Sequence, residues 1–273
     1  MRITRVLPVA GPGEDPGPRG LDDEGTRDWL EGLYRPASVE HVRLNFVASV
    51  DGSVIGADGS SDSLSSVVDR RILGVVRELA DVVLVGAGTV RTERYVLPRR
   101  TPLAVATSSG DLSGHRFDPA QADGRLVVLC PPEARDRALA TLAGVPAELV
   151  PVPLGAAADG RLGGDDVVDA LRGLGLTSVV CEGGPALAAA LLTAGRVDEL
   201  CLTTSPELVT RASRSSPPAP AWTRGCASRS SSWTTTTAPT PAGPSPAADP
   251  LVAAGSAAGR ASGVAPGRRD GGP

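Results

Sequence analysis

Short apolar runs and amphipathic segments alternate along most of the chain. The runs VRLNFVAS (42–49) and DVVLVG (81–86) have the length and aliphatic content of strands buried in a sheet. The same pattern predicts further strands at 102–107, 125–130, 147–152, 177–182 and 197–205. These strands together predict one central β-sheet.

Segments with helical spacing separate these runs. In residues 64–80 the apolar side chains recur every three or four positions, which is the period of one helix face. A short amphipathic piece, RDWLEGLY (27–34), precedes the first strand. Further helices are expected at 132–143, 165–174 and 184–195. Strands that alternate with helices predict an α/β fold with a mostly parallel mixed sheet flanked by helices.

The alternation stops near Val209. Residues 210–273 contain one Leu, two Val and no Ile, Phe or Glu. A segment with so little apolar surface cannot offset the entropy lost on ordering it. We therefore expect an N-terminal arm (1–40), one domain (41–209) and a disordered low-complexity tail (210–273), with the C-terminal strands of the sheet missing.

A frameshift is one interpretation of this tail. Trp has the single codon TGG and Thr codons begin with AC, so skipping two bases makes the Trp233–Thr234 junction encode Asp. If the preceding serines use TC-type codons with G or C in third place, those codons would encode Leu or Val, and the following Thr junctions would encode Asp or His. A genuine low-complexity linker is the alternative, and resequencing the gene distinguishes the two.

Composition narrows the classes of function. The net charge is −4, all 27 basic residues are Arg, and no basic patch with interleaved aromatic residues occurs, so nucleic acid is not an expected partner. No run approaches the ~18 apolar residues of a membrane span, which predicts a cytoplasmic protein. The cysteines form no C-x-x-C and no metal framework. Buried reduced thiols are predicted for Cys130, Cys181 and Cys201.

Two glycine-rich turns follow expected strands. VGAGTVR (85–91) lacks the third glycine of a dinucleotide fingerprint, but its glycines would let the backbone approach a ligand. In CEGGPALAAALL (181–192) a strand ends at Glu182 and a helix starts at Pro185. Free N–H groups and the positive helix end would suit a phosphate there. A plain strand-to-helix turn is the alternative reading of each motif.

A third motif joins NFVASVDG (45–52) to the serine-rich loop GSSDSLSS (59–66). Its Ser-x-Asp-Gly end indicates an Asx-type turn, and Ser63 or Ser65 is expected to cap the following helix. These structural roles leave the crowding of serines in one loop without an explanation.

In this order the motifs resemble the reductase domain of the bacterial riboflavin-biosynthesis deaminase-reductase, particularly its stand-alone actinobacterial relatives. The resemblance spans about 42–209 and rests on NFVASVDG, LSS-x-x-DR, ADVVLVGAGTVRTERY, and VVCEGGPALAAALLTAGRVDEL followed by TTSPEL. It implies a dihydrofolate-reductase-like fold and a homodimer. It also implies that hydride from NADPH reduces a ribosylamino group on a pyrimidine phosphate to ribitylamino.

The resemblance also implies ligand contacts. Arg77 would receive the substrate phosphate as a fork donor. The implied substrate contacts are Ser61, Arg77, Leu97, Arg100 and Glu182. The implied cofactor contacts are Val47, Ser63, Thr89, Glu93, Ser108, Gly183, Gly184, Pro185, Ala186 and Leu187. Many family members have Trp in place of Ser63 and Asp in place of Glu93, and neither a proton donor nor a metal site is implied.

Two alternatives stay open at this stage. A dihydrofolate-type reductase would belong to the same class of enzyme, and its substrate would distinguish it. A catalytically impaired protein that binds NADPH without turnover belongs to a different class. The unusual C-terminus keeps that second alternative open, since the expected sheet would lack its last strands.

Overall fold

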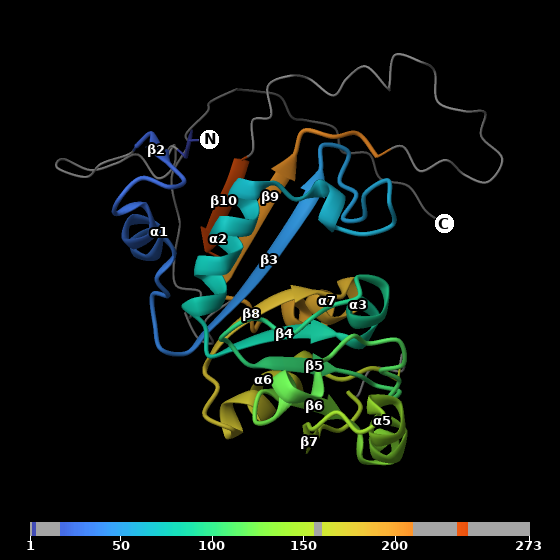
Figure 1. Cartoon of the computed structure of the whole chain (residues 1–273). Helices are drawn as coiled ribbons and strands as arrows, with labels where there is room; N and C mark the ends of the chain where they lie inside the picture. Colours follow the sequence, from blue (N-terminus) through green and yellow to red (C-terminus); the bar gives the residue numbers. More distant parts are fainter. Residues whose placement is uncertain (1, 4–16, 156–159, 210–233, 240–273) are drawn as a thin grey trace, which may run out of the picture. The chain divides into compact units, whose positions relative to one another are not determined.

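The computed structural model describes residues 2–3, 17–155, 160–209 and 234–239. One sheet of eight strands has the order β10-β9-β3-β8-β4-β5-β6-β7 (Figure 1). Its strands are β3 (His41–Ser49), β4 (Val82–Gly86), β5 (Leu103–Ala106), β6 (Leu126–Cys130), β7 (Glu148–Pro151), β8 (Ser178–Gly183), β9 (Glu199–Ser205) and β10 (Thr234–Pro239). Seven of these strands pair in parallel, and β10 lies antiparallel to β9. The predicted α/β class and its mostly parallel sheet are confirmed.

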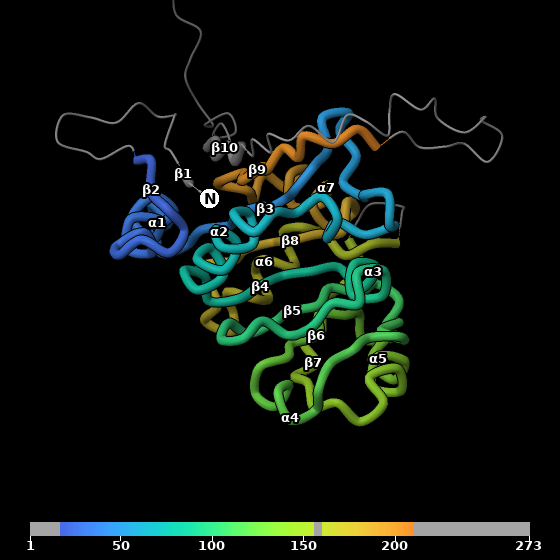
Figure 2. Tube along the Cα trace, turned by 45° about the horizontal axis from the view of Figure 1, so that its top comes forward, coloured from blue at the N-terminus to red at the C-terminus, as the bar shows by residue number. Residues whose placement is uncertain are grey.

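Helices cover both faces of this sheet. One face carries α1 (Thr26–Tyr34), α2 (Val67–Glu78) and α5 (Arg135–Leu142), and the other carries α6 (Gly164–Gly173) and α7 (Pro185–Thr193). The helix α1 lies beside α2 in both views (Figure 1, Figure 2). Shorter elements are β1 (Arg2–Ile3), β2 (Arg19–Gly20), α3 (Ala87–Thr92), α4 (Pro119–Ala122) and the 3-10 turns at Asp62–Leu64 and Pro132–Ala134.

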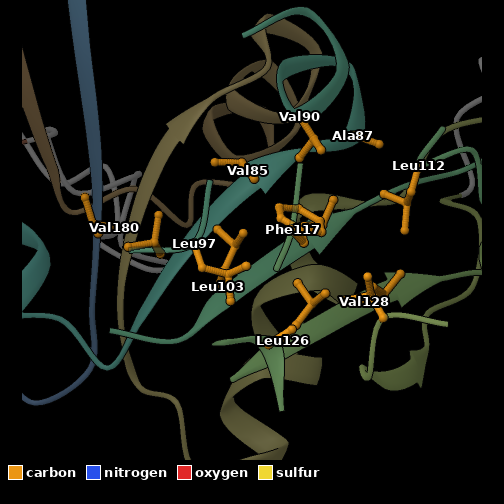
Figure 3. Packing of buried hydrophobic residues seen from close by; sticks show 14 of the residues in the cluster. Val85, Ala87, Val90, Leu97, Leu103, Leu112, Phe117, Leu126, Val128 and Val180 are labelled. Atoms are coloured by element: carbon orange, nitrogen blue, oxygen red, sulfur yellow. The ribbon is translucent and has the colours of Figure 1, made fainter. Parts of the chain in front are cut away.

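The strands are apolar on both sides, which produces two cores. In β4, Val83 and Val85 face the core under α2, whereas Val82 and Leu84 face the core under α6 and α7. Successive side chains of a strand point to opposite faces, so a wholly apolar run suits a sheet covered on both sides. Figure 3 shows the first of these cores, where β4, β5 and β6 meet the loops and helices above them.

The start of α2 differs from the expected one by a few residues. The helix predicted over 64–80 begins at Val67, after the 3-10 turn. Its cap is Ser66, whose hydroxyl accepts a hydrogen bond from the Asp69 N–H at 3.1 Å. The prediction of Ser63 or Ser65 as the cap was wrong, because Ser65 instead donates its hydroxyl to the Asp69 carboxylate at 2.6 Å.

The C-terminal segment contributes one strand. Residues 234–239 pair with β9, with Thr236 opposite Leu202, whereas the sequence predicted no strand there. Strand pairing uses backbone groups, and threonine is β-branched and favours extended backbone, so a threonine run can extend the edge of a sheet. The rest of 210–273 lies outside the described residues, so its expected disorder and the frameshift stay predictions.

The predicted buried thiols are confirmed at Cys130, Cys181 and Cys201, and Cys226 lies outside the described residues. Burial raises the pKa of Cys181 and of Cys201 to about 12, which makes these thiols poor nucleophiles. Within the described part of the chain, no helix has the length and apolar character needed to cross a membrane.

Candidate functional site

A large pocket lies at the carboxyl edge of the sheet. Its lining comes from the ends of β3, β4, β5 and β8, from α2, α3 and α7, and from the loop that follows β3. Ligands of open α/β sheets bind at this edge, where loops and helix starts replace the strands. The volume of about 1390 Å³ exceeds that of a typical site for one small molecule, so two ligands can lie side by side.

Most of the predicted site residues meet in this pocket. The substrate contacts found in its lining are Ser61, Arg77 and Glu182. The cofactor contacts found there are Val47, Thr89, Glu93, Ser108, Gly183, Gly184, Pro185, Ala186 and Leu187. The four motifs are far apart in the sequence, and the parallel sheet brings them together because all its parallel strands end at the same edge.

Three predicted contacts lie outside the pocket lining. Leu97 packs into the core under α2 (Figure 3), and the Ser63 hydroxyl donates to Asp58 at 2.8 Å. Arg100 is largely exposed, with its Nη1 at 3.7 Å from a carboxylate oxygen of Glu78. In the segment after α3, Leu97 is buried whereas Val96 and Arg100 are exposed.

Three polar side chains form a compact cluster in the pocket. Arg77 donates from Nε to Glu182 Oε1 and from Nη2 to Glu182 Oε2, both at 2.6 Å. The Tyr95 hydroxyl donates to Glu182 Oε2 at 2.6 Å and accepts from Arg77 Nη2 at 2.9 Å. The guanidinium also lies over the Tyr95 ring, 5.8 Å from its centroid. Each member of the cluster therefore contacts both of the others.

Burial and charge fix the protonation of two members of this cluster. Burial, and next the charge of Glu182, raise the pKa of the Tyr95 phenol well above its usual value. Burial opposes the charge on Arg77, but the hydrogen bond to Glu182, the charge of Glu182 and the contacts with Tyr95 together outweigh burial and raise the pKa of the guanidinium. The sequence predicted that Arg77 donates two hydrogen bonds to the substrate phosphate. In the structure Arg77 donates two hydrogen bonds to the Glu182 carboxylate.

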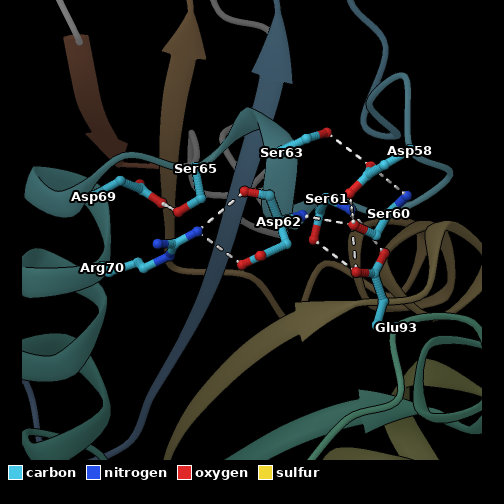
Figure 4. A network of polar contacts seen from close by, with 9 residues as sticks. All are labelled: Asp58, Ser60, Ser61, Asp62, Ser63, Ser65, Asp69, Arg70 and Glu93. Atoms are coloured by element: carbon cyan, nitrogen blue, oxygen red, sulfur yellow. Dashed lines mark hydrogen bonds and ion pairs between the residues drawn. The ribbon is translucent and has the colours of Figure 1, made fainter.

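The serine-rich loop is held by carboxylates (Figure 4). Ser61 donates its backbone N–H and its hydroxyl to Glu93, each at 3.1 Å. Asp58 accepts from the Ser60 N–H at 3.0 Å and from the Ser63 hydroxyl at 2.8 Å. These bonds, the Ser60 N–H first, lower the pKa of Asp58. The serines therefore crowd one loop because they fasten it over the pocket.

The second glycine-rich turn forms a cradle between β8 and α7. Gly184 has φ of 93°, a left-handed conformation that favours glycine. A Cβ atom at Gly184 would lie 3.4 Å from the Gly86 Cα, so the turn also packs closely against the end of β4. No side chain in the described part of the chain caps α7, and the first residues of this helix line the pocket. An anionic group fits such a helix start.

Sequence reasoning missed several residues of the pocket wall. Asn45, Asp69, Tyr95 and Arg161 line it as well. The Asp69 carboxylate is already satisfied by hydroxyls, including that of Thr203 at 2.6 Å. Tyr95 had a signal in the sequence, since it ends the RTERY segment of a recognised motif and is one of only two tyrosines in the chain.

Sequence comparisons place these features among known proteins. A model of the RibD C-terminal domain matches residues 40–220. The riboflavin biosynthesis protein RibD of Mycobacterium tuberculosis (strain H37Rv) is 30% identical over 196 residues, which cover 67% of this chain and 46% of that protein. The RibD of Corynebacterium ammoniagenes is 33% identical over 89 residues, or 32% of this chain and 25% of that protein. The chain thus spans about half the length of the Mycobacterium relative and less of the Corynebacterium one.

Solved structures show a similar fold. A pyrimidine reductase-like protein from Corynebacterium diphtheriae matches with a TM-score of 0.53 at 24% identity, covering 67% of this chain and 83% of that one. The riboflavin biosynthesis reductase of Saccharomyces cerevisiae matches with a TM-score of 0.51 at 18% identity, covering 71% and 89%. At these identities the likeness concerns the arrangement of strands and helices.

Proposed function

We propose a reductase function for this chain, starting from the fact that it belongs to the RibD C-terminal domain family. The proposed reaction converts the ribosylamino group of a 5-amino-6-(5-phosphoribosylamino)pyrimidine to a ribitylamino group, with NADPH as the reductant, in riboflavin biosynthesis. One observation carries the proposal: a single pocket contains both an anion cradle and a buried carboxylate held by two donors.

The residues of the cradle fit a dinucleotide. Gly184 packs against Gly86 at the end of β4, and both glycines and the first residues of α7 line the pocket. We place the cofactor phosphates at this turn, from Gly183 to Leu187. Thr89 and Ser108 line the same side of the pocket and offer hydroxyls. When bound there, NADPH supplies the hydride.

The opposite wall suits the substrate. Glu182 accepts from a sugar hydroxyl or amine, because a buried carboxylate lowers its energy by meeting donors. Of the Arg77 guanidinium nitrogens, Nε and Nη2 are used by Glu182, which leaves Nη1 for the substrate phosphate. Arg70 lies two turns earlier on the same face of α2 and lines the pocket, where it pairs with Asp62 at 2.9 Å. Ser63, Leu97 and Arg100 lie outside this pocket, so no contact within it is proposed for them.

The chemistry balances with one hydride and one proton. In the opened imine form of the substrate, a C–H bond forms at sugar C1, the C=N electron pair moves to nitrogen, and that nitrogen takes a proton. Tyr95 is a poor source of this proton, because its raised pKa keeps the phenol protonated. The protein supplies position and charge in this reaction, and the cofactor supplies the electrons.

The domain limits, assembly and location follow from the same proposal. We propose residues 41–209 as the reductase domain, a homodimer as the assembly and the cytoplasm as the location. A dihydrofolate-type reductase would share the cofactor and differ in the substrate. A chain that binds NADPH without turnover would point to the catalytically impaired alternative.

Absorbance at 340 nm tests the proposal. The purified full chain is incubated with NADPH and either the ribosylaminopyrimidine phosphate or dihydrofolate, and NADPH oxidation is followed. We expect oxidation with the pyrimidine substrate, none with dihydrofolate, and slower oxidation when NADH replaces NADPH. Oxidation with dihydrofolate alone would establish the other reductase, and NADPH binding without oxidation of either substrate would contradict the proposed activity.

A further inference from the structure

Among the residues that the structure describes, three hydrogen bonds reach Glu182, which leaves one acceptor position. A carboxylate offers about four lone-pair sites. Oε2 accepts from both Arg77 Nη2 and the Tyr95 hydroxyl, whereas Oε1 accepts from Arg77 Nε. The side chain of Glu182 is only 6% exposed, and Glu182 belongs to the lining of the pocket. The open site therefore belongs to Oε1.

The backbone before Tyr95 is shaped to deliver its hydroxyl to this carboxylate. Arg94 has φ of 51°, a left-handed conformation that is costly for a residue other than glycine. It stands between Glu93, which holds the Ser61 loop, and Tyr95, which holds Glu182. The bonds from Glu93 N to Thr89 O, at 2.9 Å, and from Tyr95 N to Val90 O, at 3.2 Å, secure the turn. Neighbouring side chains thus reach two different walls of the pocket.

We propose that Tyr95 is a positioning residue, which together with Arg77 orients Glu182 so that its one open acceptor site, on Oε1, receives a hydroxyl or amine of the substrate sugar. The inference rests on the proposed reductase function and assigns this site a ligand chemistry: a hydrogen-bond donor, and not an anion. Tyr95 acts through Glu182, since its own hydroxyl is already engaged as donor and acceptor. Its raised pKa keeps the donated proton in place at all ordinary pH values.

The test removes one hydroxyl at a time. Tyr95→Phe keeps the ring under the Arg77 guanidinium and deletes the bond to Glu182. Tyr34→Phe is the matched control, because Tyr34 is the only other tyrosine of the chain and lies buried in α1, away from the pocket lining. For each full-length variant, kcat and KM for the ribosylaminopyrimidine phosphate are measured together with the Kd for NADPH.

We expect Tyr95→Phe to lower kcat/KM by about tenfold or more, with the Kd for NADPH changed less than twofold. Tyr34→Phe should leave both quantities within twofold of the unmodified chain. A double-mutant cycle supplies the further readout: in a Glu182→Gln background, Tyr95→Phe should cost less than twofold, because the group on which it acts has already changed. A packing role for Tyr95 would cost the same in both backgrounds.

The outcomes are distinguishable. An active chain whose Tyr95→Phe variant is equally active would overturn the inference and leave the proposed function standing. Equal losses in the two backgrounds would also overturn it, since Tyr95 would then not act through Glu182. A chain that never oxidises NADPH with the pyrimidine substrate would overturn the proposed function, and the inference with it.

Discussion

Two Arg–Glu pairs at opposite ends of the sheet share their chemistry and differ in their surroundings. At the carboxyl edge, Glu182 pairs with Arg77 beside the Tyr95 hydroxyl. At the amino end of β3 and β9, Arg43 donates from Nε to Glu199 Oε2 at 2.7 Å and from Nη2 to the Tyr34 carbonyl at 2.7 Å. We call the first the pocket pair and the second the closed pair.

Exposure separates the two pairs. In the closed pair the arginine side chain is 4% exposed and the glutamate 17%, and His41 Nε2 adds a third contact at 3.0 Å from the same carboxylate oxygen. Burial opposes ionisation of Glu199, but His41 and Arg43 outweigh it and lower the pKa of this carboxylate. In the pocket pair the glutamate is the more buried member at 6%, and the arginine is 28% exposed. The closed pair therefore holds the end of α1 against the sheet. The pocket pair, which has the same two residue types, presents a carboxylate to a ligand because it lines the pocket.

The largest expected effect is on stability, in the closed pair. Glu199→Gln leaves the Arg43 charge buried without its counter-charge, and breaking such a pair costs about 3–5 kcal/mol of unfolding free energy. Urea unfolding measures this loss. The kinetic constants of the folded fraction should stay within twofold, and a raised KM would show that the closed pair also serves the pocket.

The second effect is on catalysis, in the pocket pair. Glu182→Gln removes the charge that orients the substrate, so kcat/KM should fall about 100-fold, or about 3 kcal/mol of transition-state stabilisation. Unfolding free energy should fall by only about 1 kcal/mol, because Arg77 reaches water at the pocket and is screened there. If this variant lost as much stability as Glu199→Gln and kept its turnover, the contrast between the two pairs would be wrong.

The third effect concerns Arg77 itself. Arg77→Ala should raise the KM for the pyrimidine substrate about tenfold and that for NADPH less than twofold, because the substrate wall loses both a charge and the partner of Glu182. Arg71→Ala is the control on the same helix, since Arg71 is half-exposed, pairs with Asp22 and lies outside the pocket lining. Equal increases in the two KM values would show that Arg77 has a structural role and does not bind the substrate specifically.

The sequence predicts the order of elements well because that order depends on local patterns. The strand expected at 81–86 is β4, and the helix expected at 184–195 contains α7. Glu182 and the glycine turn beside it were predictable because they adjoin in the sequence. The contact between Glu182 and Arg77 was not predictable, because the two residues lie 105 positions apart. Periodicity predicts which side chains share one face of a helix, but it does not predict which residues that face contacts. The left-handed backbone conformation of Arg94 was not predictable either, because glycine is the residue expected in that conformation.

The fourth effect is confined to the cofactor wall. Gly184→Val should raise the Kd for NADPH severalfold, because a side chain would strain a backbone with φ of 93° and press on the end of β4, which distorts the turn. Gly144→Val is the matched control, because Gly144 has φ of 88°, is exposed, and has no atom of the described residues within 4 Å of an added Cβ. NADPH affinity is measured by titration. An unchanged affinity in Gly184→Val, or an equal change in both variants, would contradict the proposal that NADPH binds at this turn.

The last effect is alkaline, and it involves the tyrosine that lies beside each pair, Tyr34 or Tyr95. Burial raises the pKa of both Tyr34 and Tyr95 in the folded state. A raised folded pKa means that the folded state holds the proton more tightly, so this stabilisation is fully present below pH ~10 and is lost as the pH rises further. The buried thiols Cys181 and Cys201, with pKa values of about 12, act in the same direction from pH ~8.5. Unfolding free energy measured from pH 8 to 11.5 should fall, and a flat profile would contradict the burial of these groups.

The most direct test of the central claim follows the hydride itself. The chain is incubated with the ribosylaminopyrimidine phosphate and NADPH carrying deuterium in the transferable position at C4, and the product is analysed by mass spectrometry and NMR. If the pocket brings the cofactor and the sugar together as proposed, the ribitylamino product gains one deuterium, bound to sugar C1. A product with hydrogen at C1, or oxidation of NADPH without any deuterium in the pyrimidine, would contradict the account.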